Sequence, residues 1–388
     1  MRIVLLRSRA TDFATIDKWA STLSRGGHDV HVVLWDRQDI LTRTDNYPYR
    51  ITRFVFRVPQ DQISGMFFLP IWWFFAFQFI LRRKPDIVHA IDLDTLLVAV
   101  AVRLISTSII AYAIHDFYAN NIPVYRLGFF GRILRTLFAE IESDLLRFTS
   151  AVFLMDEKRV NEIKRAPAQG YVFVYNSPPD MLQHLRAQVD FSPPHSQTSA
   201  LKVFYCGLIH SNRGLEHIME AVSQMEGVEL QIAGIGPDTQ IVQEYERRCA
   251  KISYIGWIET YEDVMRLTYW SDVLFRFSNP NIPKTAFESP NKIFEAMMCM
   301  KPVIVSSGSG MSDIVEKEKC GIIVPYGDLA AIRSSLIALR DSPELRSRLG
   351  ANGRRAYEEK YSWSIMERRI IETYCKLERT SKREVAKK

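Results

Sequence analysis

Short apolar runs alternate with amphipathic stretches along most of the chain, a pattern that predicts an α/β protein. Residues 1–6 predict a buried strand, residues 15–25 an amphipathic helix, and residues 30–34 the next strand. A helix that returns the chain to a neighbouring strand indicates a parallel sheet. Further strands are expected at residues 86–89, 109–114, 151–155 and 171–175. We therefore expect a first domain, residues 1–176, built on a doubly wound parallel sheet.

The second half repeats this alternation after a stretch rich in proline and serine, residues 177–199, which predicts an interdomain linker. Strands are expected at residues 201–206, 228–233, 252–256, 273–277 and 303–305, with helices between them. We place a second α/β domain at residues 200–362, and a last helix and basic tail at residues 363–388. The expected fold is two doubly wound, Rossmann-like domains.

Composition narrows the class of protein. With 388 residues, 47% hydrophobic and 24% charged, the chain is typical of a folded protein with more than one core. Its five cysteines are far apart and odd in number, which favours reduced core thiols over disulfides or a metal site. The first apolar run is too short for a signal peptide, so we expect a cytoplasmic location. The net charge of +6 favours anionic partners, but no nucleic-acid-binding motif is present, so nucleic acid is not an expected partner.

The clearest candidate chemistry lies in residues 288–306, ESPNKIFEAMMCMKPVIVS. Ser289 is a suitable N-cap, so a helix is expected to begin there and to end before the strand PVIVS. Asn291 and Lys292 then stand at a helix N-terminus, where free N–H groups and the helix dipole favour phosphate. Glu295, about one turn further on, is placed to accept hydrogen bonds from sugar or ribose hydroxyls.

This stretch resembles glycosyltransferase family 4, the retaining enzymes of the GT-B fold. That family carries two glutamates with seven residues between them, followed by Ala-Met and a Pro-Val-Ile strand. Glu295 stands at the second glutamate, whereas the position eight residues earlier is Phe287 and the nearest acid is Glu288. The chain resembles the branch that reads SPNK-x-x-E. The resemblance implies two domains facing a central cleft, a donor held mainly by the second, a last helix that returns to the first, and ribose bound by Glu295.

Other loops of the second half resemble the donor site of the family. The turn of residues 207–214, GLIHSNRG, has Leu208 where the family has an arginine and Arg213 where it has a lysine. The resemblance implies that Arg213 holds the donor diphosphate, with Lys292 compensating for the missing cation. The full set of expected donor-binding residues is Gly207, Arg213, Gly236, Ile258, Ser289, Asn291, Lys292 and Glu295.

In the first half, polar residues follow two expected strands: Asp92 and Asp94 after one, His115 and Asp116 after the next. Ligands gather at the carboxyl ends of parallel strands. His115 also resembles the histidine that family 4 places near the sugar, so the expected catalytic residues are His115, Asp116 and Glu288. Arg7 and Arg9, in the first loop, are interpreted either as contacts to an anionic acceptor or as solvated loop charges.

Two stretches suggest contact with a membrane. Residues 66–81, MFFLPIWWFFAFQFIL, carry no charge and precede Arg82-Arg83-Lys84, which is typical of a helix at an anionic membrane surface. The alternative is a buried helix of the first domain. Residues 125–148 form a second candidate, with phenylalanines beside arginines. Together they predict peripheral association with the inner face of the cell membrane.

The function that we expect is retaining transfer of a sugar from a nucleoside-diphosphate sugar to a glycan or lipid-linked acceptor, in cell-surface polysaccharide or glycoconjugate synthesis. The family resemblance implies front-face substitution, with a diphosphate oxygen taking the acceptor proton. No Asp-x-Asp signature stands in the second half, so no metal or other cofactor is expected. The alternatives are a nucleotide-sugar 2-epimerase of the same fold and a non-catalytic partner subunit.

Overall fold

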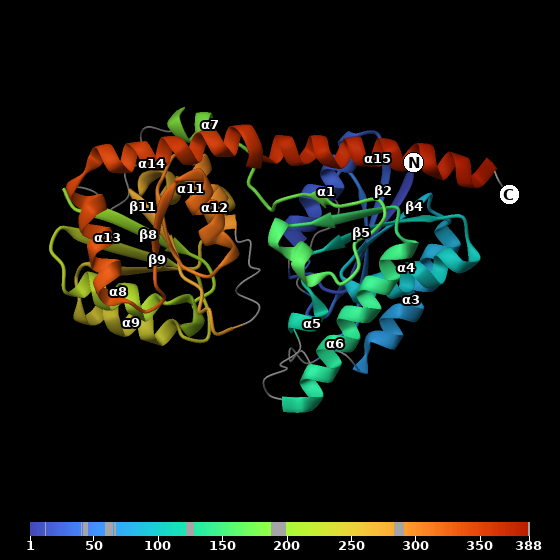
Figure 1. Ribbon diagram of the computed structural model, residues 1–388, viewed down its shortest axis with the longest axis horizontal. Coiled ribbons are helices and arrows are strands. Elements are labelled where there is room, and N and C mark those ends of the chain that lie inside the picture. The colour runs from blue at the N-terminus through green and yellow to red at the C-terminus, as the bar shows by residue number, and fades with distance from the viewer. Residues whose placement is uncertain are drawn as a thin grey trace. The chain divides into compact units, whose positions relative to one another are not determined.

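The computed structural model describes residues 1–11, 13–39, 41, 46–58, 65, 67–121, 128–187, 199–282 and 291–386. The chain forms two compact units (Figure 1). Unit 1 consists of Met1–Tyr175 and Met366–Lys388, and unit 2 of Asn176–Ile365. The last helix, α15 (Trp363–Ala386), therefore begins in unit 2 and continues into unit 1.

Unit 1 is built on a seven-stranded parallel sheet in the order β3-β2-β1-β4-β5-β6-β7. The strands are β1 (Arg2–Arg7), β2 (Asp29–Asp36), β3 (Arg50–Val55), β4 (Ile87–Ile91), β5 (Ile109–Ile114), β6 (Ala151–Leu154) and β7 (Val172–Phe173). The central strands are buried on both faces, which explains their continuous apolar runs. The strand order reverses between β1 and β4, as in a doubly wound sheet.

The helices of unit 1 cover both faces of this sheet (Figure 1). On one face lie α3 (Leu69–Arg83), α4 (Leu93–Ile105) and α6 (Gly128–Leu145), whose apolar residues share a core with Val4 and Leu6 of β1. Trp19 of α1 (Phe13–Arg25) packs on the other face, against His89 of β4 and Phe153 of β6. Shorter helices are α5 (Tyr118–Asn121), η1 (Leu146–Phe148) and η2 (Glu157–Glu162).

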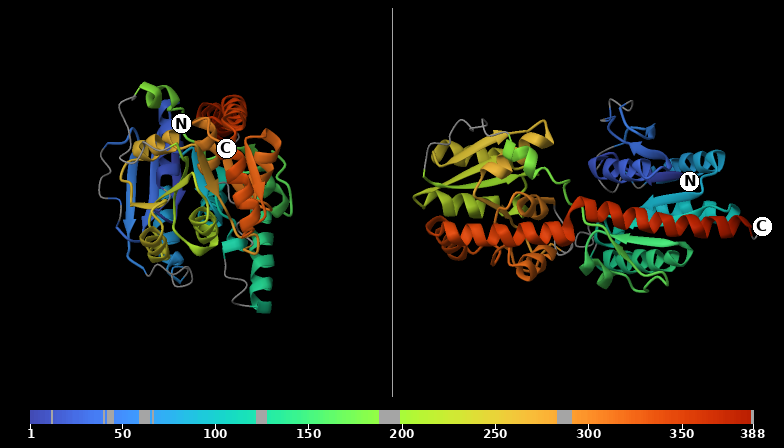
Figure 2. Two further views of the ribbon diagram at one scale, coloured as in Figure 1. Left: turned by 90° about the vertical axis from the view of Figure 1, so that its left-hand side faces the viewer. Right: turned by 90° about the horizontal axis from the view of Figure 1, so that it is seen from above.

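The far part of α15 completes this second face, as Figure 2 shows from above. Tyr374 is fully buried, stacks on the His89 ring, and places its hydroxyl 2.5 Å from His89 Nδ1. Burial, with a smaller contribution from His115, lowers the pKa of His89 to about 3, so its imidazole is a neutral core group. Arg369 adds a hydrogen bond of 2.8 Å to the carbonyl of Phe173.

Unit 2 contains a six-stranded parallel sheet in the order β10-β9-β8-β11-β12-β13, which reverses between β8 and β11. Its strands are β8 (Leu201–Cys206), β9 (Val228–Ala233), β10 (Ile252–Gly256), β11 (Val273–Arg276), β12 (Val303–Ser306) and β13 (Gly321–Val324). With this second sheet, the predicted fold of two doubly wound, Rossmann-like α/β domains is confirmed.

The helices of unit 2 also form two layers. One layer contains α8 (Leu215–Ser223), α9 (Thr239–Arg248) and α13 (Leu329–Asp341); the other contains α10 (Tyr261–Trp270), α11 (Asn291–Met298) and α12 (Gly310–Glu318). They are followed by α14 (Pro343–Ala356) and a π-helical turn, η5 (Tyr357–Tyr361). The stretch expected as a linker carries a short helix, α7 (Leu182–Ala187), and Asp180 before it binds Arg354 at 2.6 Å.

Within the apolar stretch, the described residues 67–81 lie mostly in or against the core and leave one exposed stripe. Leu69, Trp72, Ala76 and Ile80 of α3 are buried, whereas Phe67, Ile71 and Phe74 on the opposite stripe are exposed. The alternative of a buried first-domain helix therefore holds for most of α3, and the exposed stripe is the exception. None of the described helices combines the length and the hydropathy that crossing a membrane requires.

The cysteines are all free, and Cys299 and Cys320 are buried as expected of core thiols. Cys375 is exposed on α15, so the expectation of a core position is wrong for this residue. The amphipathic pattern of α15 directs Tyr374, its neighbour in sequence, into unit 1 instead.

Candidate functional site

Each sheet has one point at which the strand order reverses, and the predicted site residues follow the strands that meet there or strands further out in the same sheet. In unit 1 the loops after β1 and β4 adjoin, with the loop after β5 next to them. In unit 2 the corresponding loops follow β8 and β11. The crevice at such a reversal is where doubly wound proteins bind their ligands.

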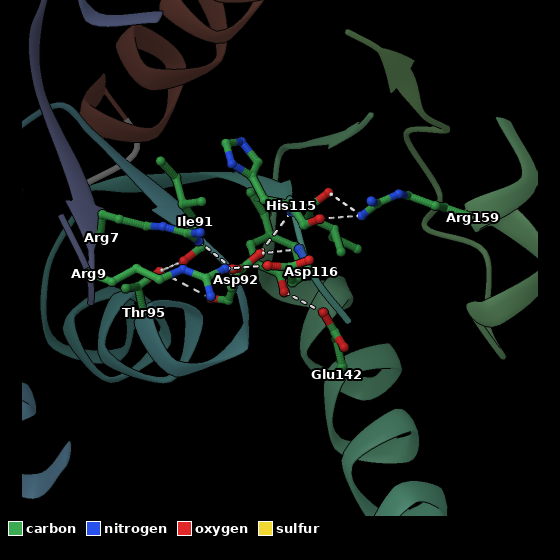
Figure 3. Close-up of polar contacts among 11 residues, drawn as sticks. Arg7, Arg9, Ile91, Asp92, Thr95, His115, Asp116, Glu142 and Arg159 are labelled. Carbon is green, nitrogen blue, oxygen red and sulfur yellow. Dashed lines mark hydrogen bonds and ion pairs between the residues drawn. The ribbon is translucent and has the colours of Figure 1, made fainter. Parts of the chain in front are cut away.

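Asp92 is the centre of the cluster in unit 1 (Figure 3). Its Oδ1 accepts hydrogen bonds from the backbone N–H groups of His115, at 2.8 Å, and Asp116, at 2.9 Å. Its Oδ2 binds Arg7 and lies 3.4 Å from Arg9. Asp92 is 2% exposed and Arg7 1%, so the side chains join the ends of three strands below the surface.

This arrangement shows that both interpretations of Arg7 are wrong. Its guanidinium is buried and bound to Asp92, so it is neither a solvated charge nor a group presented to an acceptor. Arg9 remains partly exposed and also binds the carboxylate of Asp116. Partial burial alone would raise the pKa of Asp116, but Arg9, Arg7 and Arg159 outweigh it and lower that pKa, so Asp116 is an anion at neutral pH.

Arg159, within η2, holds the same segment from its other side. Its buried guanidinium donates to the carbonyl of Ile114, at 3.3 Å, and to that of His115. The His115 peptide is therefore bound at its N–H by Asp92 and at its C=O by Arg159. Sequence reasoning missed Arg159, because an arginine 44 residues away carries no local sign of this contact.

Two further acids lie behind this cluster. Asp94 is buried, which raises the pKa of its carboxyl, with Ser8 opposing that shift. Glu142 of α6 is also buried and accepts a hydrogen bond from the hydroxyl of Tyr112. Burial, opposed by Tyr112, raises the pKa of Glu142 to about 8, so its carboxyl is mainly neutral at pH 7. Glu142 was not predicted as a site residue.

In unit 2, backbone contacts hold the loop that contains Gly207. Gly207 N–H donates to the Ala233 carbonyl at 3.0 Å, and Ile209 N–H to the Ile235 carbonyl at 3.1 Å. A Cβ on Gly236 would lie 1.9 Å from the carbonyl oxygen of Ile209. Glycine is needed at 236 because the two loops touch there, independently of any ligand.

Arg213 ends η3 (Ser211–Arg213), directly before Gly214 in the left-handed region at a φ of 61°. A Cβ on Gly214 would lie 2.9 Å from Cβ of Phe277, just after β11. Asn279 N–H adds a hydrogen bond of 3.2 Å to the carbonyl of Asn212. The half-buried Arg213 therefore stands where the loops after β8 and β11 meet.

Lys292 and Glu295 form an ion pair on α11, with Nζ 2.8 Å from Oε2. The Tyr261 hydroxyl of α10 donates to the other oxygen of Glu295 at 3.1 Å. Burial disfavours the charged ammonium, but Glu295 outweighs it and raises the pKa of Lys292. Both groups lie near enough to Cys206, at the end of β8, to influence its thiol, whose pKa burial raises. Lys292 therefore belongs to the same strand-end region as Gly207.

The remaining predicted residues are distributed as follows. Asn291 is the first residue of α11 and is half-buried, and Ile258 is half-buried beside the exposed Trp257 after β10. Glu288 and Ser289 lie outside the described residues. Within the described ranges, no three His, Cys, Asp or Glu side chains gather as metal ligands would.

Comparisons with known proteins agree with the architecture. Residues 200–342, most of unit 2, match the family model described as "Glycosyl transferases group 1". A lipopolysaccharide core biosynthesis glycosyltransferase, LpsD of Rhizobium meliloti, is 25% identical over 195 residues, 49% of this chain and 52% of that protein. The chain spans about half the length of this curated relative.

Solved structures match over almost the whole chain. Sucrose-phosphate synthase from Thermosynechococcus elongatus superposes with a TM-score of 0.76 at 17% identity, covering 98% of this chain and 100% of that one. HepE of Anabaena, in complex with UDP-glucose, gives 0.71 at 15% identity, covering 97% and 100%. At these identities the likeness establishes the fold, which is that of the GT-B glycosyltransferases.

Proposed function

We propose that this protein is a retaining glycosyltransferase that moves a sugar from a nucleoside-diphosphate sugar to a glycan or lipid-linked acceptor, in cell-surface polysaccharide or glycoconjugate synthesis. The observation that carries the proposal is the placement of Lys292. A half-buried, charged ammonium stands in the first turn of α11, near the end of β8 and the Gly207 turn, inside the matched segment. A helix N-terminus combined with a cation suits a diphosphate.

Departure of the diphosphate is the step that these residues assist. Negative charge grows on the bridging oxygen as the bond to the sugar lengthens. Arg213, Lys292 and the positive end of the α11 dipole can stabilise that charge without a metal ion. Glu295 keeps Lys292 charged and in place. Each Glu295 oxygen can accept a second hydrogen bond, so ribose hydroxyls can be bound beside Lys292 and Tyr261.

We assign the acceptor to unit 1, with His115 and Asp116 facing it. Asp92 and Arg159 bind the backbone of His115, so the backbone position from which its imidazole extends is fixed. A preorganised group costs less to position when the acceptor arrives. Asp116, kept anionic by Arg9, can orient an acceptor hydroxyl by accepting a hydrogen bond from it.

The test is a transfer assay with a panel of UDP-, GDP- and ADP-sugars, comparing wild type with an Arg213→Ala, Lys292→Ala double variant. The double variant should lose most turnover. An Arg248→Ala, Lys317→Ala variant removes two exposed cations from other helices of unit 2 and should retain it. Wild-type turnover in the first variant would overturn the assignment of the donor site.

The products of the transfer assay distinguish the proposed function from its alternatives. NMR of the product should show the anomeric configuration of the donor, whereas inversion would contradict a retaining enzyme. A changed configuration at C2 of the donor sugar itself would identify an epimerase. Nucleotide binding by calorimetry without turnover, over an acceptor panel that includes lipid-linked glycans, would identify a non-catalytic subunit.

The lipid-linked class of acceptor is supported by two exposed apolar stripes in unit 1. Ile71 and Phe74 line one side of α3, and Phe67 lies just before the start of that helix; Phe129, Phe130, Ile133 and Leu137 line one side of α6. Phe67 is 78% and Phe130 73% exposed, values unusual for residues of this size. Figure 1 shows the N-terminal half of α6 extending beyond the other elements of unit 1.

The basic residues near these stripes favour an anionic membrane as the surface that they contact. Arg132 lies on α6 within one turn of Phe129 and is exposed, and Arg82, Arg83 and Lys84 are exposed at the end of α3. A helix of 15 residues is about 22 Å long, so the basic end of α3 and Phe67 touch one surface only if α3 lies along it. We therefore place α3 parallel to the inner face of the cell membrane.

A further inference from the structure

A cavity of about 250 Å³ lies in unit 1 beside the segment that follows Asp116. It opens to solvent and is lined mainly by residues of α6, η1, η2 and the start of α5. Among its lining residues, apolar and hydrogen-bonding groups alternate: Phe117, Ala139, Glu142, Ser143, Leu146 and Asn161. Its volume is below the roughly 300–1,000 Å³ of pockets for drug-sized ligands, so it suits a single ring rather than a nucleotide.

Glu142 gives the cavity a neutral hydrogen-bonding group. Figure 3 shows its side chain pointing from α6 toward the end of β5. Tyr112 donates to Oε1, and within the described ranges Oε2 has no hydrogen-bond partner. Because burial keeps the proton on this carboxyl near neutral pH, Glu142 can donate one hydrogen bond and accept others.

The cations at the cavity are already neutralised. Arg135 lies 3.4 Å from Glu162, and Lys164 Nζ lies 2.7 Å from Glu140 Oε1. Binding an anion there would require those pairs to break. The lining therefore favours an uncharged ligand that combines an apolar face with hydroxyl groups.

We infer that this cavity binds a neutral sugar ring, packed against Phe117 and hydrogen-bonded to Glu142. The inference rests on the proposed function, and the ring is a residue of the acceptor glycan other than the one that reacts. Phe117 follows His115 by two residues, and the Arg159 guanidinium lies 6.0 Å from the Phe117 ring while donating to the His115 carbonyl. An occupant would therefore contact the segment that carries the candidate catalytic residues.

The test uses the full chain and the methyl glycosides of glucose, galactose, mannose and N-acetylglucosamine as probes, observed by saturation-transfer NMR. At least one glycoside should bind wild type. Glu142→Leu, which removes the hydrogen bond, and Ala139→Phe, which fills the cavity from the half-exposed side of α6, should each weaken that binding at least tenfold. Glu142→Gln should restore it, because an amide is neutral and still bonds.

The matched control is Asp144→Asn, on the same helix but paired with Arg165, because neither residue lines the cavity; this variant should bind as wild type does. No binding of any glycoside, or equal binding in Ala139→Phe, would overturn the inference. So would competition by inorganic phosphate, or a Glu142→Gln variant as impaired as Glu142→Leu. Nucleoside-diphosphate binding, measured by calorimetry on the same samples, reports separately on the proposed function.

Discussion

The carboxylate of Asp92 accepts a hydrogen bond of 2.8 Å from the backbone N–H of His115, across the ends of β4 and β5. A second bond of 2.9 Å to the next N–H makes Asp92 the anchor of the turn that presents both candidate catalytic residues. The other oxygen of Asp92 is occupied by Arg7, which is equally buried. Three loops are thus connected through one carboxylate.

Asp92→Asn should destabilise the protein severely. The amide oxygen can still accept from His115, but Arg7 is left as a buried cation without its counter-charge, a change that costs about 3–5 kcal/mol. Urea unfolding measures it. Asp29→Asn is the matched control, because Asp29 pairs with Arg50 on the surface, where such pairs contribute about 0–1 kcal/mol. Equal effects of the two substitutions would mean that the Asp92 pair is not a buried one in solution.

Glu142 should make stability depend on pH. Its pKa is about 8 in the folded protein against an ordinary value of 4.5, so between these values the folded state holds a proton that the unfolded state has lost. The free energy of unfolding should therefore fall as pH rises through this window, by up to about 1.4 kcal/mol per pH unit from this group.

Glu142→Gln has no titrating group at this position. The free energy of unfolding of the variant minus that of wild type should therefore rise from pH 5 to pH 8 and then level off. Urea titrations at intervals of one pH unit measure the difference. Parallel curves for the two proteins would show that Glu142 titrates normally, and would argue against a neutral carboxyl.

Glu295→Gln should weaken donor binding by about 1.5–3 kcal/mol, or roughly ten- to a hundredfold, because a charged acceptor is lost. Calorimetry with the donor identified by the panel is the measurement. Since Glu295 is only 1% exposed and pairs with Lys292, a moderate loss of stability should accompany it.

A double-mutant cycle with Lys292→Gln separates the two roles of Glu295. If Glu295 contacts the donor itself, Glu295→Gln should weaken binding further in the Lys292→Gln background. No further loss there would show that Glu295 acts only by holding Lys292.

Liposome binding should depend on both charge and aromatic residues. Wild type should sediment with anionic liposomes at low salt, and less, but measurably, at high salt, because salt screens the basic residues while the apolar contacts remain. Binding to neutral liposomes should be weaker and should not depend on salt. A protein that stays in the supernatant under all four conditions would leave the stripes without a membrane role.

Two variants test the orientation of α3. Phe67→Ser with Phe74→Ser should reduce the salt-insensitive part, and Arg82→Gln with Arg83→Gln the salt-sensitive part. Leu104→Ser, at the exposed end of α4, provides a control for the loss of one surface apolar residue outside the stripes. A helix that stood upright on the membrane would respond to only one of the two pairs.

Most of the fold could be predicted because buried parallel strands leave continuous apolar runs. Strands β5, β8, β9 and β10 have the predicted bounds. Strand β3 was missed because its sequence, RITRFV, lies at the edge of the sheet and mixes polar and apolar residues without a continuous apolar run. Strand β13 was missed because GIIV is four residues long and opens with glycine.

Less of the candidate site than of the fold could be predicted from the sequence. The strand-end positions of His115 and Asp116 could be read from local pattern, but their contacts with Asp92 and Arg159 join residues far apart in the chain. The pair of Lys292 and Glu295 is different, since residues three apart on a helix are neighbours. This spacing is enough to predict that the two side chains contact each other, but the sequence analysis assigned Lys292 to the diphosphate and Glu295 to the ribose and did not predict their ion pair.

The burial of Tyr374 against His89 has a consequence for how the chain is made. A ribosome releases residues 1–175 first, yet the sheet that they form lacks part of the cover of one face until Tyr374 has been synthesised. Unit 2, whose residues are contiguous, is complete at Ile365 and can fold earlier. Domains usually mature from the N-terminus during translation. Here a helix made after unit 2 finishes the unit that precedes it in the chain, so a chain truncated before α15 should yield a folded unit 2 and an incomplete unit 1.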